Sequence, residues 1–180
     1  FIKNPKSTVE LQNGQTIHFF PTNKIRIPVE KNTIINNKVV ASKYNDSIVS
    51  YIDIDIKGNA LYKNRLMMLD IIANNNWKRP IYFSPGAFED EDYLWMKNYL
   101  QLEGMVYKLV PIKTKVEKDT NPMDMGGLDA DKMYSIVMKW DWGNSRGDIY
   151  HDPETRKNSI SYRSVLSRLM DKLIVEGKLD

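Results

Sequence analysis

The apolar positions between residues 60 and 75 recur at intervals of three and four, which places them on one face of a helix. They are Tyr62, Leu66, Leu69 and Ile72. Asn59 is a favourable residue type for capping the start of such a helix. The three asparagines at 74–76 tolerate the left-handed geometry of a helix end. The pattern therefore predicts a helix over residues 60–75.

The next stretch is interpreted as strand, helix, strand. Pro80 ends the first helix, and the apolar run after it predicts a strand over residues 80–84. Four consecutive carboxylates then favour the start of a helix over residues 89–103. A strand over residues 105–110 follows. Segments of this length are typical of a βαβ unit, so we expect two parallel strands joined by a right-handed crossover.

Turn signals punctuate the N-terminal part of the chain. Asn13-Gly14 is a strong hairpin signal and predicts strands over 8–12 and 15–20. A second hairpin, over 33–41, is expected around the asparagine pair at 36–37.

Two further segments alternate between apolar and polar residues. In residues 25–29 the apolar positions are separated by polar ones, and Pro28 favours the edge of a sheet. Residues 51–56 alternate in the same way, with isoleucines toward the core and with Asp53 and Asp55 on the outer face.

The C-terminal part predicts two helices. Asp129 suits the N-cap of a helix whose face carries Met133, Val137 and Trp140. Asp152 followed by proline starts a second helix. Its apolar stripe comprises Tyr162, Val165, Leu166, Leu169 and Leu173. The predicted fold is thus α/β: a small mixed sheet with a central βαβ unit and N-terminal β-hairpins over 1–127, and a helical C-terminal extension over 128–180 that packs on it as one structural unit.

Composition narrows the function classes. The chain has 180 residues, a formal net charge of +3 and no cysteine. Thiolate catalysis and thiolate metal sites are therefore excluded, and the mixed charges lack the basic stripe of a nucleic-acid-binding protein. No apolar run approaches the roughly 20 residues that span a bilayer. The chain starts at Phe1 without an initiator methionine, so we expect it to be part of a longer polypeptide.

Asp53 and Asp55 are the one candidate metal pair. Residues two apart on a strand share a face, so their carboxylates can share a divalent cation. The competing interpretation, which we favour, is the hydrated face of a half-buried strand. His18 and His151 have no neighbouring pattern of ligands or nucleophiles, and both are interpreted as ordinary histidines. No phosphate-binding loop or nucleophile motif occurs, and we expect no cofactor and no catalytic residue.

Aromatic residues supply the candidate binding sites. Trp140, Trp142 and Asn144 can form a platform on which a sugar stacks, although such a cluster more often closes a core. Trp77 and Arg79 can form a recognition pair or, as we favour, a cation–π contact that fixes the local structure.

Several segments together resemble a known family. They are the signature at 66–83 (Leu-Met-Met-Leu-Asp-Ile-Ile-Ala-Asn-Asn-Asn-Trp-Lys-Arg-Pro-Ile-Tyr-Phe) and the segments at 93–96, 99–104, 107–111 and 140–144. The family comprises large multi-pass membrane proteins of Gram-negative bacteria described as protein O-mannosyltransferase-like, or as a domain of unknown function. The resemblance implies a membrane portion similar to glycosyltransferases that use lipid-linked sugars, with a soluble C-terminal portion facing the periplasm. The acidic catalytic loops lie in the membrane portion, so no catalytic residue carries over to this chain.

Three hypotheses follow. In the first, the chain is a non-catalytic extracytoplasmic domain of a glycosyltransferase-like inner-membrane protein. It would contact the membrane-embedded portion of the same polypeptide and bind or position a protein or glycan partner. In the second, it is a sugar-active, metal-dependent enzyme domain that uses Asp53 and Asp55. In the third, it is a purely architectural module.

Overall fold

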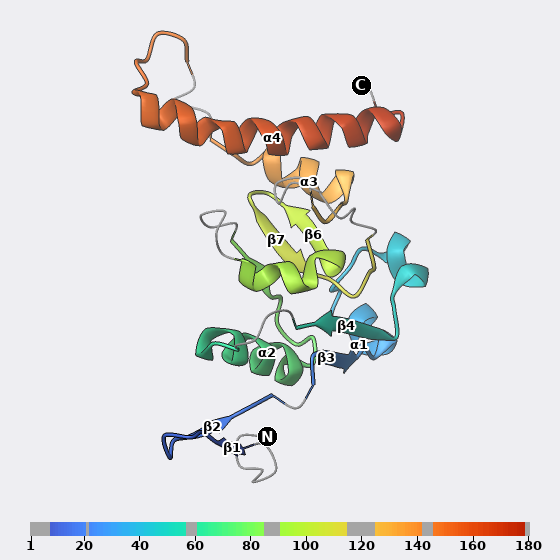
Figure 1. The fold of residues 1–180 in the computed structure, drawn as a ribbon. Helices are drawn as coiled ribbons and strands as arrows, with labels where there is room; N and C mark the ends of the chain where they lie inside the picture. Colours follow the sequence, from blue (N-terminus) through green and yellow to red (C-terminus); the bar gives the residue numbers. More distant parts are fainter. Residues whose placement is uncertain are drawn as a thin grey trace.

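The structure, a computed structural model, describes residues 8–20, 22–56, 61–84, 91–114, 125–141 and 146–178, with the backbone alone for 91–94. The elements lie along an elongated molecule. A hairpin projects at the N-terminal end, and a long helix crosses the opposite end (Figure 1). The strands are β1 (Thr8–Glu10), β2 (Thr16–His18), β3 (Lys24–Pro28), β4 (Tyr51–Asp55), β5 (Tyr82–Phe83), β6 (Leu100–Glu103), β7 (Val106–Leu109) and β8 (Gly127–Leu128). The helices are α1 (Lys31–Asn36), α2 (Lys63–Asn75), α3 (Ala130–Val137) and α4 (Pro153–Val175), with 3-10 helices η2 (Ser42–Ser47) and η3 (Glu91–Tyr99).

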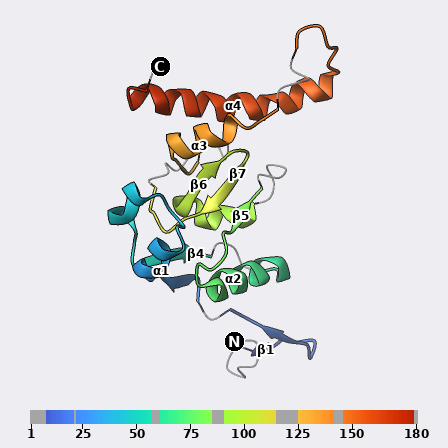
Figure 2. The same cartoon turned by 180° about the vertical axis from the view of Figure 1, so that it is seen from behind.

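Two N-terminal strand pairs confirm the predicted alternation. β1 and β2 form an antiparallel hairpin around the Asn13-Gly14 turn. β3 and β4 pair antiparallel, with Ile52 and Ile54 fully buried and the two aspartates of β4 exposed. Both views show α1 and α2 at the level of this second pair (Figure 1, Figure 2), and α2 packs Leu69 and Ile72 into the same core.

The predicted hairpin over 33–41 is wrong. The chain forms α1 there, in which Ile34 is fully buried and the Asn37 amide donates to the Thr33 carbonyl at 3.0 Å. An asparagine pair suits the end of a helix as well as a turn, because asparagine accepts both conformations. The local sequence therefore did not distinguish a hairpin turn from a helix end at residues 36–37.

The central sheet has the order β5-β7-β6-β8 and is mixed. β6 pairs with β8 in parallel, whereas β7 is antiparallel to both β5 and β6. The predicted parallel βαβ unit and the helix over 89–103 are therefore wrong in detail. The described part of that helix is η3, and its last predicted turn is strand β6. Gly104, with a φ of +64°, forms the tight turn between β6 and β7.

The remaining helices follow the predicted caps. α2 begins at Lys63, later than predicted, and ends at Asn76 in the left-handed conformation; the proposed cap Asn59 lies outside the described residues. The Asp129 side chain caps α3, and Asp152 caps α4 with proline at the first position. Val165 and Leu169 of α4 are buried in the same core as Met133 and Val137 of α3, and Figure 1 shows α4 lying across α3. Within the described residues, no helix combines the length and the hydropathy needed to cross a bilayer.

Candidate functional site

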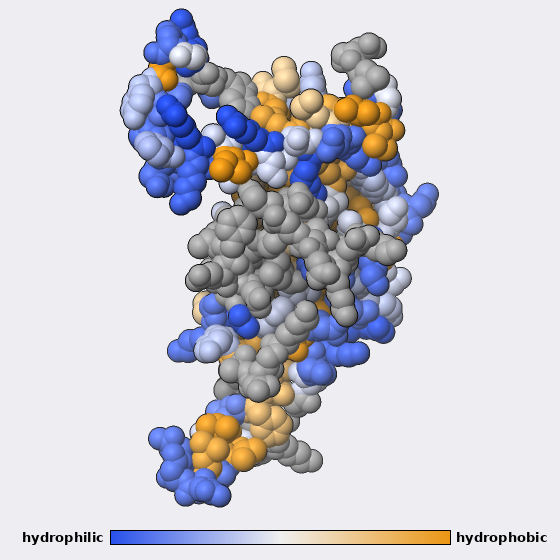
Figure 3. Space-filling model, turned by 45° about the horizontal axis from the view of Figure 1, so that its top comes forward, coloured by the Kyte–Doolittle hydropathy of each residue, from blue (hydrophilic) through white to orange (hydrophobic). Residues whose placement is uncertain are grey.

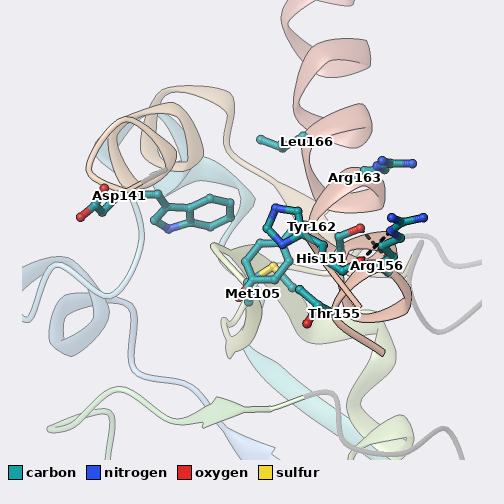
Figure 4. Close-up of a pocket in the computed structure, with 10 residues that line it drawn as sticks. Met105, Asp141, His151, Thr155, Arg156, Tyr162, Arg163 and Leu166 are labelled. Carbon is teal, nitrogen blue, oxygen red and sulfur yellow. Dashed lines mark hydrogen bonds between the residues drawn. The ribbon is translucent and has the colours of Figure 1, made fainter. Parts of the chain in front are cut away.

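A pocket of about 790 Å³ lies beside α4. Its walls come from the turn between β6 and β7, the segment that follows α3, the segment before α4 and the first half of α4. The lining residues are Met105, Trp140, Asp141, His151, Thr155, Arg156, Ser159, Tyr162, Arg163 and Leu166. Figure 4 shows the labelled side chains of His151, Thr155, Arg156, Tyr162 and Arg163 around the first turns of α4, with Asp141 on the opposite wall.

The first turn of α4 fixes the polar wall. The Asp152 carboxylate accepts hydrogen bonds from the Thr155 amide at 2.8 Å and from the Thr155 hydroxyl at 3.2 Å. The Thr155 amide holds the pKa of Asp152 below its usual value. Arg156 Nε donates to the His151 carbonyl at 2.9 Å, which ties the incoming segment to the helix. The cap therefore sets where the polar side chains of this turn lie.

Two aromatic rings form the apolar wall. The rings of Trp140 and Tyr162 meet edge to face, with centroids 5.8 Å apart and planes at 86°. Trp140 is half-buried, while Tyr162 keeps 45% of its surface exposed. A Cβ atom at Gly104 would lie 3.3 Å from Ile136 Cγ2 and 3.7 Å from Trp140 Cζ2. The close approach to Ile136 and the positive φ both favour glycine at this turn, while the distance to the indole is an ordinary contact.

Hydroxyl, imidazole and charged groups complete the lining. Thr155 and Ser159 contribute hydroxyls, and the Ser159 hydroxyl donates to the Arg156 carbonyl at 2.6 Å. A hydroxyl can also accept hydrogen bonds, and His151 can donate or accept. An apolar aromatic wall with a few convergent polar groups is typical of a binding pocket for a small ligand.

The predicted platform of Trp140, Trp142 and Asn144 is only partly described. Trp140 lies in the pocket, whereas Trp142 and Asn144 lie outside the described residues. Sequence reasoning placed Tyr162 in a core stripe and treated His151 as ordinary. The positions 155, 159, 162 and 166 have the helical spacing of one face, and this face directly follows the predicted cap. That spacing was the available signal for the pocket.

Trp77 and Arg79 lie outside this pocket. Trp77 is half-buried against both apolar clusters of the core, and its carbonyl accepts from Asn37 Nδ2 at 3.0 Å. The Arg79 side chain is exposed, while its carbonyl accepts from Asn75 Nδ2 at 2.7 Å. Among the described residues the cation–π contacts involve other pairs, such as Arg65 over Trp95 at 5.1 Å. Trp77 therefore acts as a packing residue between α2 and β5.

Asp53 and Asp55 lie on the outer face of β4, as predicted. Asp53 is engaged by Arg26, whose Nε and Nη2 lie 2.6 and 3.2 Å from its carboxylate oxygens. This hydrogen bonding lowers the pKa of Asp53. Asp55 faces Lys24 across the ladder. In the part of the chain that the structure describes, no three side chains of the His, Cys, Asp and Glu types gather into a metal-binding group.

Comparisons with known proteins identify the family. The model of TMEM260-associated domain 2 matches residues 2–132, from the N-terminal hairpin to the first turn of α3. The curated proteins and the solved structures give no match. Met105 lies within the matched region, and the rest of the pocket is built from residues after it. The match spans more than half of the chain, so the chain belongs to the TMEM260-associated domain 2 family and is an accessory domain of a membrane-protein family.

Proposed function

We propose that this chain is a non-catalytic extracytoplasmic domain that binds a glycan in the pocket beside α4. In this role it holds the glycan, or a protein that carries it, near the membrane-embedded portion of the same polypeptide. The observation that carries the proposal is the edge-to-face pairing of Trp140 and Tyr162 in a pocket that hydroxyl, imidazole and charged groups also line.

The chemistry of sugars fits this lining. A pyranose ring presents C–H groups on its faces and hydroxyls around its edge. The exposed face of Tyr162 can pack on the C–H groups, while Thr155, Ser159 and His151 can exchange hydrogen bonds with the hydroxyls. A volume of about 790 Å³ has room for an oligosaccharide segment and lies in the usual range for ligand pockets.

The family membership and the resemblance support the membrane context. The family is linked to membrane proteins, and the signature at 66–83 resembles that of O-mannosyltransferase-like proteins whose C-terminal portions face the periplasm. A mannose-containing glycan is therefore the first ligand to test. The O-mannosyltransferase-like activity belongs, in this proposal, to the membrane portion and not to this domain.

Exposed apolar side chains support a contact with the rest of the polypeptide. Figure 3 shows one group of them on the projecting hairpin, where Val9, Ile17 and Phe19 are 40–48% exposed. Isolated two-stranded hairpins are marginally stable on their own, so this one gains most from a neighbouring surface.

A matched pair of tyrosine variants tests the proposal. We expect isothermal titration with a mannose oligosaccharide chosen on a glycan array to give saturable binding. Tyr162→Ala should weaken that binding about tenfold, because removing an aromatic contact costs about 1 kcal/mol or more. Tyr134→Ala is the control, since Tyr134 is similarly exposed on α3 and lies outside the pocket. Equal affinities for both variants, or no glycan binding at all, would contradict the proposal.

A separate titration tests the alternative that the chain is a metal-dependent enzyme domain. Titration with Mn²⁺ and a nucleotide sugar should give no heat that depends on Asp53. Binding that Asp53→Asn abolishes would favour the metal-dependent alternative instead.

A further inference from the structure

A second pocket, of about 440 Å³, lies over the polar face of the central sheet. Gln101 of β6 lies directly opposite Lys108 of β7, and Glu103 follows two residues later on the same face. The segment between α1 and η2 covers them, with Lys38 and Val39 in the wall. Asp129 and Lys132, at the start of α3, also line this pocket.

The polar groups of this pocket are held in place. Gln101 is 9% exposed and Glu103 6%. The Glu103 carboxylate accepts from Tyr82 Oη at 3.1 Å and from Gln101 Nε2 at 3.2 Å, and Lys108 Nζ lies 3.6 Å away. Lys108 Nζ also donates to the Val39 carbonyl at 2.7 Å, which ties the covering segment to the sheet.

The burial of Gln101 and Glu103 costs folding free energy. Burying charged and amide groups costs free energy, and an apolar face would have packed under this segment more simply. Here the polar groups surround an open volume instead. The Tyr82 hydroxyl, whose pKa burial and the Glu103 carboxylate raise to about 12, donates to that carboxylate and helps to fix it. A rigid, hydrogen-bonded polar wall around a hollow is what a preorganised ligand site requires.

The charges at the mouth indicate the sign of the ligand. Asp129 is already engaged by Lys43 Nζ at 2.7 Å and by the amides of its own helix cap. Glu103 is engaged by Lys108. Within the described residues, the Nζ atoms of Lys38 and Lys132 have no hydrogen-bond or ion-pair partner. Two cations therefore remain uncompensated at the pocket.

We propose that this pocket binds a small anion that carries a carboxylate or phosphate group. Lys38 and Lys132 contact its charged oxygens, and the buried Gln101–Glu103 wall accepts hydrogen bonds from any hydroxyl it carries. The pocket shares no residue with the pocket beside α4, so the two assignments stand or fall separately.

Amide chemical shifts in the 180-residue chain test this site, with inorganic phosphate and malonate as probes and glycerol as the neutral comparison. We expect saturable shifts at residues 38–42 and 101–108 with at least one anion, and none with glycerol. Tighter phosphate binding identifies a phosphorylated ligand, and tighter malonate binding a carboxylate.

Two double variants separate a site from general attraction. Lys38→Gln/Lys132→Gln should weaken binding at least about tenfold, because it removes both charge-assisted contacts. Lys78→Gln/Lys139→Gln removes the same charge from exposed positions outside the pocket and should leave the affinity unchanged. Shifts that never saturate, or equal weakening by both double variants, would overturn the proposal.

Discussion

Backbone conformation at single residues directs the chain between its layers. Asn76 and Trp77 both have positive φ, at 46° and 57°, and together they turn the chain from α2 toward β5. Residues other than glycine rarely adopt a positive φ, and a residue as bulky as Trp77 does so very rarely. The half-buried Trp77 ring and the hydrogen bond from Asn37 to its carbonyl hold it there. Packing thus outweighs a local conformational cost.

Substitutions at Asn76 should report this cost. Asn76→Ala should lower the free energy of unfolding by about 1 kcal/mol, because alanine is strained in the left-handed region. Asn76→Gly should leave it within about 0.5 kcal/mol, since glycine has no such strain. Urea denaturation measures both. Asn74→Ala, at a helical position of α2, is the control, and a loss there as large as at Asn76 would contradict the explanation.

At the scale of elements, an ion network joins the two C-terminal helices to η2. Asp131 lies between Lys43 of η2, at 2.6 Å, and Lys178, which follows α4. Lys43 also bonds Asp129, the cap of α3, at 2.7 Å. These contacts fix the far end of α4, while Val165 and Leu169 anchor its middle. The network therefore helps to keep α4 in the position that forms the wall of the first pocket.

The pH dependence of stability should reveal the Asp131 contacts. Hydrogen bonds from Lys178 and Lys43 lower the pKa of Asp131 from 3.8 to about 2. A carboxylate whose pKa falls on folding stabilises the fold above its unfolded pKa, and this contribution is lost as the pH falls toward 2. Asp131→Asn should therefore lower the Tm at pH 7, and the difference should shrink between about pH 4 and pH 2.

Thermal unfolding from pH 7 to pH 2 measures this difference. Asp171→Asn, on the exposed side of α4, serves as the control. A Tm difference for Asp131→Asn that stays constant over the whole range would contradict the assignment.

The elements that a turn, an alternation or a helix cap marks could be predicted from the sequence. The elements that depend on pairing between distant strands could not. The Asn13-Gly14 turn, the alternation in β4 and the caps at Asp129 and Asp152 each act within a few residues. The segment Leu100–Glu103 also alternates between apolar and polar residues, but it was interpreted as the end of the helix over 89–103. Its pairing with β7 and β8 makes it a strand, and pairing partners are not visible in local periodicity. The site followed the same rule: Trp140 was identified, but its contact with Tyr162 depends on how α4 packs.

At the scale of the whole molecule, the layers succeed one another from the N-terminal hairpin to α4 (Figure 1). The residues that match the family, 2–132, include these elements from the N-terminal hairpin to the start of α3. The pocket beside α4 lies where the matched region meets the C-terminal helix, and only Met105 of its lining comes from the matched part. The two proposed sites share no lining residue, so the domain has room for a glycan and a small anion at once.

The most direct test of the glycan-binding role is to map where a mannose oligosaccharide shifts the amide resonances of the chain. If the glycan binds beside α4, the shifts are saturable and concentrated at Met105, Trp140, His151 and residues 155–166, and the sugar is unchanged at the end of the titration. Shifts centred on Asp53 and Asp55, conversion of the sugar, or no saturable shift at all would contradict it.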